Sequence, residues 1–226
     1  MIINYIFKVL YFLPYIGLAV YIVRVIILKS VPAKVPKGKK LTHELLDACI
    51  EQLKKQDKSN HGSYRVSECV LSGLKEDMQN PGNLKKLLDD ICEHVGLNGD
   101  LFSLNVINSI VSDKAGEIRP GVSNINITID LKEEYDVNTV ISVMAHEVMH
   151  QYLFFKGISR RDKWENEILT DTAVVYTGFY EYMIKGYEVK HGVNPFAYTK
   201  VGYITTKDIE YIKDNIYWEN WYSVAY

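Results

Sequence analysis

The chain of 226 residues is 47% hydrophobic, which is enough for a real core, and its length allows one domain of ordinary size with an appendage. Its formal net charge of −2 is unevenly divided, because the first 40 residues hold seven basic and no acidic residues and leave 19 basic against 28 acidic residues in the rest. A domain with that acidic excess is a poor candidate for binding nucleic acid, so we expect no nucleic-acid partner.

The appendage is an apolar segment near the N-terminus. Residues 9–28 are almost wholly apolar, interrupted only by Pro14, Gly17 and Arg24, and their number matches the hydrocarbon thickness of a bilayer. A cleaved signal peptide would need a basic region before the segment and a small-residue site after it, and the sequence offers little beyond Lys8. We therefore expect a transmembrane anchor within residues 1–30, with a buried helix or a hairpin broken at Pro14 as the alternatives.

Basic residues follow this segment. Six of them lie between Arg24 and Lys40, and the first acidic residue is Glu44. The positive-inside rule then predicts a single-pass membrane protein whose main domain, residues 41–226, faces the cytoplasm. Residues 31–40 contain Pro and Gly and have the composition of a basic juxtamembrane linker, which suits anionic membrane lipid.

Helical patterns fill the next stretch, at about residues 42–58, 63–79 and 81–95. We assign no chemistry to them. The histidines of this region lack partners at metal-ligand spacing and are typical of surface or capping residues: His43, His61 and His94. The three cysteines form no CxxC pair, so we expect buried free thiols, in agreement with a reducing compartment: Cys49, Cys69 and Cys92.

Alternating β-branched residues then predict a small sheet. The strand patterns cover residues 102–111, 117–119 and 124–130, and turn-forming residues separate them. Together with the helices, they predict an α+β domain.

The next predicted helix contains the sequence Val-Met-Ala-His-Glu-Val-Met-His-Gln, residues 143–151. Positions i and i+4 share one face of a helix, so His146 and His150 can point at one metal ion. Glu147, about 100° round the helix, can reach toward a water on that ion. This is the HExxH arrangement of zinc hydrolases.

Chance produces such a motif in roughly one chain per hundred of this length. The surrounding apolar pattern favours a genuine buried helix, which Asn138 or Thr139 can cap and Gly157 can end. A core helix with two satisfied histidines is the alternative.

A second motif, Asn-Glu-Ile-Leu-Thr-Asp at residues 166–171, supplies a third ligand. The elongated metzincin motif is excluded, because Leu153 and Lys156 occupy the positions of its Gly and its third His. Glu167 follows His150 by 17 positions (167 − 150), far enough for the chain to turn and return a second helix. A His, His, Glu set leaves one position open for water.

HExxH followed by NExx[ST]D resembles the gluzincin metallopeptidases, the clan of thermolysin and of the membrane-anchored heat-shock and CAAX-prenyl peptidases. The resemblance covers about residues 124–185 and is specific at the two motifs. It implies that Glu167 is the third zinc ligand and that Asp171 holds His146. Because it covers no more of the chain, it does not extend to the substrate.

The same resemblance implies a small antiparallel sheet before the HExxH helix, with an edge strand that pairs with an extended substrate. Residues 124–130 are our candidate for this strand, since an open edge recognises a peptide through its main chain. A plain structural strand is the alternative.

The C-terminal part is predicted to be helical at about residues 173–185, ending at Gly186, and again at about 206–218. His191 and Tyr203 lie in the loop region between these helices. Either could donate a hydrogen bond to the oxyanion of a tetrahedral intermediate, although loop His and Tyr residues commonly serve packing.

These patterns predict a membrane-anchored zinc metallopeptidase with a zincin-like domain. His146, His150 and Glu167 would hold Zn²⁺, and Glu147 would take a proton from the attacking water and pass it to the leaving amine of a protein or peptide substrate. One alternative is a catalytically silent zincin-like interaction module tethered to the membrane. Another is a membrane-tethered structural protein with an accidental motif.

Overall fold

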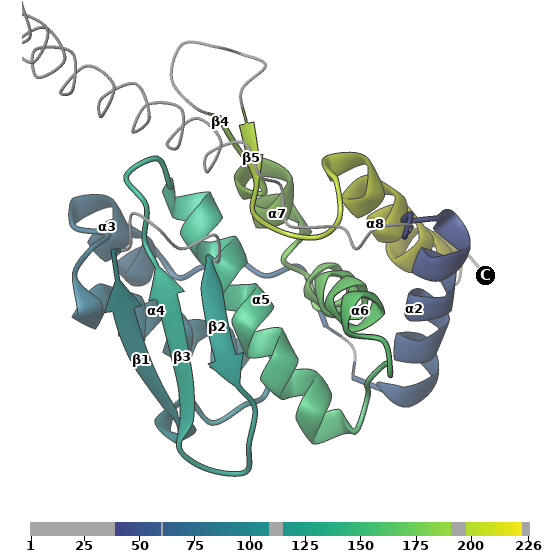
Figure 1. Ribbon diagram of the computed structural model, residues 1–226, viewed down its shortest axis with the longest axis horizontal. Coiled ribbons are helices and arrows are strands. Elements are labelled where there is room, and N and C mark those ends of the chain that lie inside the picture. The colour runs from purple at the N-terminus through teal and green to yellow at the C-terminus, as the bar shows by residue number, and fades with distance from the viewer. Residues whose placement is uncertain (1–38, 60, 109–114, 191–197, 223–226) are drawn as a thin grey trace, which may run out of the picture.

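The computed structural model describes residues 39–59, 61–108, 115–190 and 198–222. In these residues the architecture is α+β, with seven α-helices and a small three-stranded sheet (Figure 1). The predicted anchor lies outside them. Among the described residues, no helix combines the length and apolarity needed to cross a bilayer.

Three helices precede the sheet: α2 (His43–Gln56), α3 (Glu68–Glu76) and α4 (Pro81–His94). The first and last agree with the prediction, but the middle helix is much shorter than residues 63–79. The backbone N–H of Tyr64 donates to the carbonyl of Gly178 at 3.0 Å, and that of Val66 donates to the Tyr182 hydroxyl at 3.1 Å. These distant partners hold the segment in a non-helical conformation, so the helix begins only at Glu68.

The sheet contains β1 (Phe102–Ile107), β2 (Gly116–Arg119) and β3 (Ile125–Asp130) in the order β1-β3-β2. It is mixed, because β1 and β3 are parallel while β2 and β3 are antiparallel, so the predicted all-antiparallel sheet is wrong. The predicted edge strand is also wrong, because residues 125–130 form the central strand. Its three isoleucines are completely buried, whereas every residue of β2 is at least partly exposed. The edge beside α5 is therefore β2.

Helix α5 (Val137–Lys156) is the centre of the domain, and 13 of its 20 residues are buried. It is capped by Asp136, whose carboxylate accepts from the Thr139 N–H at 2.8 Å, and not by either predicted residue. Gly157 ends it as predicted, with the positive φ of 67° that glycine adopts readily. Figure 1 shows the sheet on one side of α5 and the helices α6 and α2 on the other.

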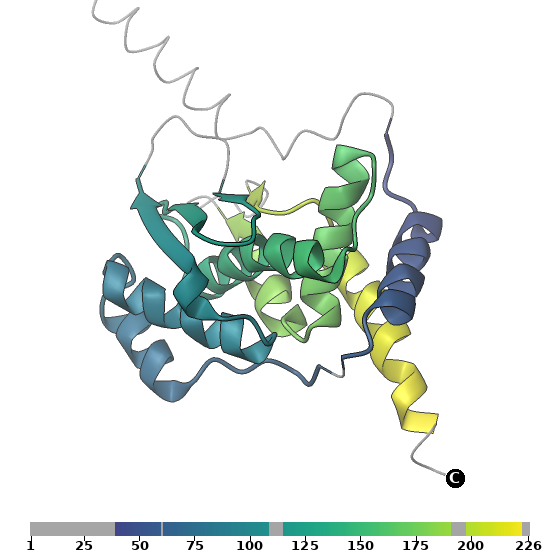
Figure 2. The same ribbon diagram turned by 90° about the horizontal axis from the view of Figure 1, so that it is seen from below.

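The C-terminal half contains α6 (Lys163–Tyr176), α7 (Tyr180–Gly186) and α8 (Thr206–Tyr222), with short strands β4 (Glu188–Lys190) and β5 (Tyr198–Lys200) before α8. The predicted continuous helix over residues 173–185 is wrong. The chain turns at Gly178, with φ of 99°, and a Cβ there would lie 2.1 Å from the Gly62 carbonyl oxygen. Figures 1 and 2 both place α8 beside α2, at the other end of the described chain.

The cysteines and isolated histidines differ partly from expectation. Cys49 and Cys92 are buried as predicted, but Cys69 on α3 is exposed. His61 Nε2 lies 2.9 Å from the Tyr152 hydroxyl, and His94 Nε2 lies 2.8 Å from the Thr177 carbonyl. Both histidines are partly buried, so they pack against neighbouring elements rather than lying free on the surface.

Candidate metal centre

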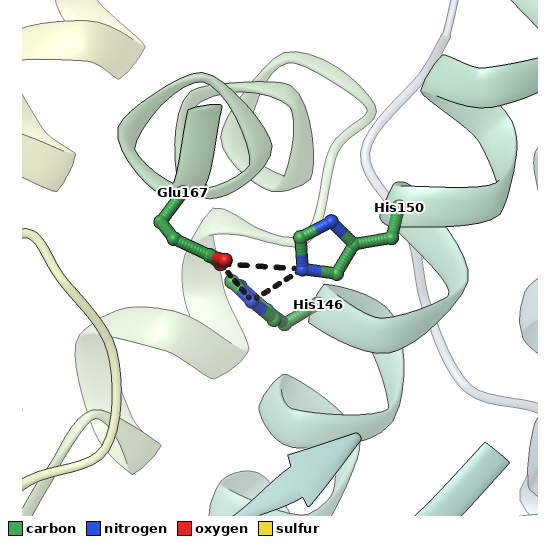
Figure 3. Close-up of side chains that lie close together, drawn as sticks. All are labelled: His146, His150 and Glu167. Atoms are coloured by element: carbon green, nitrogen blue, oxygen red, sulfur yellow. Dashed lines mark hydrogen bonds and ion pairs between the residues drawn. The ribbon is translucent and has the colours of Figure 1, made fainter. Parts of the chain in front are cut away.

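Three side chains converge between α5 and α6, as Figure 3 shows. The Nε2 atoms of His146 and His150 are 3.2 Å apart, and Glu167 Oε2 lies 3.3 Å from the first and 3.2 Å from the second. Among the residues that the structure describes, this is the one group of three or more His, Cys, Asp or Glu side chains arranged to hold a metal ion. The structure thus brings the three predicted ligands together.

The triangle formed by these three atoms fits a zinc ion. Tetrahedral zinc sites have metal–ligand bonds of about 2.0–2.1 Å for nitrogen and about 2.0–2.2 Å for oxygen, which places neighbouring ligand atoms about 3.3 Å apart. The separations of 3.2, 3.2 and 3.3 Å therefore correspond to one face of such a tetrahedron. These three side chains would supply three of the four ligands of such a tetrahedron.

Hydrogen bonds on the far side of each ring set the tautomer that a metal requires. His146 Nδ1 donates to Asp171 Oδ1 at 2.8 Å, as the resemblance implied. His150 Nδ1 lies 3.3 Å from the Thr170 hydroxyl, which donates its own proton to the Asn166 carbonyl and so accepts from the ring. These bonds favour the neutral form in which each ring keeps its proton on Nδ1 and would present the lone pair of Nε2 to a metal ion. This role of Thr170 was not predicted, although the residue belongs to the second motif.

Asp171 is completely buried and connects several elements to His146. Its Oδ1 also accepts from the Tyr187 hydroxyl at 2.5 Å, and its Oδ2 accepts from the backbone N–H groups of Tyr203 at 2.7 Å and Ile204 at 3.2 Å. Tyr187 was not predicted, because it lies outside both motifs. The carboxylate is thus held from four directions, which fixes the orientation of His146.

These contacts place the loop before α8 at the metal centre. The Tyr203 ring stacks with the His146 ring at a centroid distance of 6.2 Å, so this predicted residue lies next to the site. Gly202 allows the loop to approach, because a Cβ there would lie 2.2 Å from the Tyr187 ring. The other oxyanion candidate, His191, lies outside the described residues.

The electrostatics of the centre favour a cation. Burial lowers the pKa of His146, but its hydrogen bonds to Asp171 and Glu167 outweigh burial and raise this pKa well above the ordinary value. Burial raises the pKa of Glu167, but its contacts with both histidines outweigh that effect and lower it. Negative groups that stabilise a protonated imidazole would stabilise a divalent cation in the same way.

Glu147 lies beside the centre and next to β2. It is 6% exposed, and burial raises its pKa, while the two histidines lower it in part. A carboxylate with a raised pKa is a better proton acceptor at neutral pH. Gly116 leaves room for it, because a Cβ at that position would lie 2.5 Å from Glu147 Oε1. This contact was not predicted, since a glycine in a strand gives no sign of its neighbour.

Gln151 attaches the β2–β3 hairpin to α5. Its buried side chain accepts from the Gly121 N–H at 3.0 Å and donates to the Gly121 carbonyl at 2.7 Å. The two bonds hold the edge strand β2 in place along α5. Gln151 directly follows His150, but HExxH does not specify this position, so its role was missed.

Comparison of this chain with protein-family models, with curated proteins and with solved structures found no match. The resemblance to gluzincin peptidases therefore rests on the two motifs.

Proposed function

We propose that this chain is a gluzincin-type zinc metallopeptidase with a zincin-like domain. The observation that carries the proposal is the triangle of two imidazole nitrogens and one carboxylate oxygen, with the buried carboxylate of Glu147 beside it. Three protein ligands with one open position are typical of hydrolytic zinc sites, whereas structural zinc sites have four protein ligands. The experiment that tests the proposal is peptide hydrolysis by the full chain before and after removal of zinc.

The residues of the site would have the following roles in peptide hydrolysis. His146, His150 and Glu167 would hold a zinc ion, which would supply a Lewis acid and lower the pKa of a bound water. Glu147 would take a proton from the attacking water and return it to the leaving amine. Asp171 would hold His146, and Tyr203, whose backbone N–H donates to Asp171, is the candidate to donate its hydroxyl proton to an oxyanion.

Strand β2 is the candidate for substrate pairing, in place of residues 124–130. It is an edge of the described sheet, it lies next to Glu147 through Gly116, and Gln151 holds its hairpin on α5. An edge strand recognises an extended peptide through main-chain hydrogen bonds. A peptide on β2 would therefore pass along the metal centre.

We also propose that residues 9–28 anchor the chain in a membrane, with the peptidase domain in the cytoplasm. This part of the proposal is supported by the apolar segment and by the basic residues that follow it. A reporter fused after Tyr226 should be active only in the cytoplasm. Reporter activity on the opposite side of the membrane would show that the proposed orientation is wrong. A full-length chain that is soluble without detergent would contradict the proposed anchor.

A further inference from the structure

Four large hydrophobic side chains are exposed among the described residues: Ile107, Val122, Phe154 and Phe155. Three of them lie at one end of α5. Phe154 and Phe155 are in its last turn, 49% and 44% exposed, with ring centroids 6.0 Å apart. Val122 is 78% exposed and follows Gly121, the residue that Gln151 binds to α5. We refer to Val122, Phe154 and Phe155 as the apolar surface.

One residue of the apolar surface, Phe154, continues the line of candidate catalytic groups. At 100° and 1.5 Å per residue, Phe154 lies about 20° round the helix from Glu147 and about 10 Å further along it. Along the helix axis His150 lies between these two residues, and it is about 40° from Phe154 around the helix. Phe154 is therefore on the side of α5 that carries the metal centre and the candidate base.

The direction of β2 relates this surface to a bound peptide. The strand runs from Gly116, beside Glu147, to Arg119, next to the hairpin that Gln151 holds. A peptide that pairs with β2 in the antiparallel sense runs the opposite way. Its residues on the N-terminal side of the scissile bond then lie toward the hairpin and Phe154. At about 3.3 Å per residue, a distance of about 10 Å corresponds to three residues.

We propose that the apolar surface binds a large apolar side chain of the substrate, located about three residues before the bond that is cut. The inference rests on the proposed peptidase function and adds a substrate class, namely extended segments with Leu, Ile or Phe at that position. Exposed apolar side chains that gather on one part of a surface commonly mark interaction sites. Phe154 lies on the side of α5 that carries Glu147 and His150, so we take a peptide on β2 as the occupant of the apolar surface.

The test uses the full chain in detergent with two peptides that differ only three residues before the cleavage site, where one has Leu and the other Ser. Wild type should cleave the Leu peptide with a kcat/KM about tenfold higher or more, because a hydrophobic site discriminates by roughly this factor. Phe154→Ser should remove most of this preference, chiefly by raising KM for the Leu peptide. Val122→Ser, in an exposed hairpin where folding is least at risk, should reduce it in part.

Ile107→Ser is the matched control, because Ile107 is the remaining exposed hydrophobic residue and lies on β1, the strand at the other edge of the sheet. It should leave the preference unchanged. Equal cleavage of the two peptides by wild type, or equal effects of Phe154→Ser and Ile107→Ser, would refute the proposed role of the apolar surface and leave the proposed peptidase function intact. Binding of the same peptides to Glu147→Gln separates the two proposals. A preference for Leu in binding, with no hydrolysis by wild type, would refute the peptidase and support the surface.

Discussion

Replacing Glu147 with glutamine is expected to reduce peptide hydrolysis by a factor of about a hundred or more while zinc binding stays at the wild-type level. Glu147 is not one of the three residues that form the metal triangle, so replacing it removes no candidate ligand. Glutamine keeps the size of the side chain beside Gly116 but cannot accept the proton from water. The measurement is kcat together with zinc content, both on the full chain.

Glu165→Gln provides the control for this variant, since it makes the same chemical change on α6. The Glu165 side chain is 38% exposed, and its Oε2 lies 3.6 Å from Arg160 Nη1, away from the metal triangle. This control should keep wild-type activity. If Glu147→Gln retains more than about a tenth of the activity, a different group is the base.

Replacing Glu167 with glutamine is expected to weaken zinc binding more than replacing Asp171, which contacts the candidate ligand His146 and not the metal position. Glu167 and Asp171 lie about 40° apart on one face of α6, whereas Glu165 lies about 200° from Glu167. The distances agree with this geometry, because Glu167 Oε2 is within 3.3 Å of both histidines, whereas the Asp171 carboxylate is hydrogen-bonded to one of the two, His146. Asp171→Asn should then cost about 10 to 100 fold in zinc affinity, and Glu167→Gln more.

A competition titration against a chromophoric zinc chelator would measure this series. Glu165→Gln should titrate as wild type, Asp171→Asn should be moderately weakened and Glu167→Gln severely weakened. Loss of zinc by Glu165→Gln together with retention by Glu167→Gln would disprove the assigned ligand set.

The convergence of the three candidate ligands could be predicted because helix geometry is local. A spacing of four residues places His146 and His150 on one face wherever the helix lies. The prediction for Glu167 needed only one turn of the chain and a second helix after the first. The end of α5 could also be predicted locally, since Gly157 adopts a conformation that few other residues tolerate.

The surroundings of the site could not be predicted, because they depend on contacts between distant residues. Asp171 is held by Tyr187 and Tyr203, and Glu147 lies against Gly116, and none of these pairs has a characteristic spacing. The position of β3 at the centre of the sheet depends on strand order, which alternation of side chains does not reveal. The helix expected over residues 63–79 was shortened because Tyr64 binds the backbone of Gly178.

Hydrolysis of an unbiased peptide mixture by the full chain, with zinc removed and then restored, tests the proposed function most directly. We predict cleavage by the zinc-loaded protein, its loss on chelation, and its return with one equivalent of zinc per chain. Cleavage that persists without metal would contradict the proposed chemistry. A protein that binds one zinc at His146, His150 and Glu167 but cleaves no peptide would contradict the peptidase and identify the domain as a zinc-binding module.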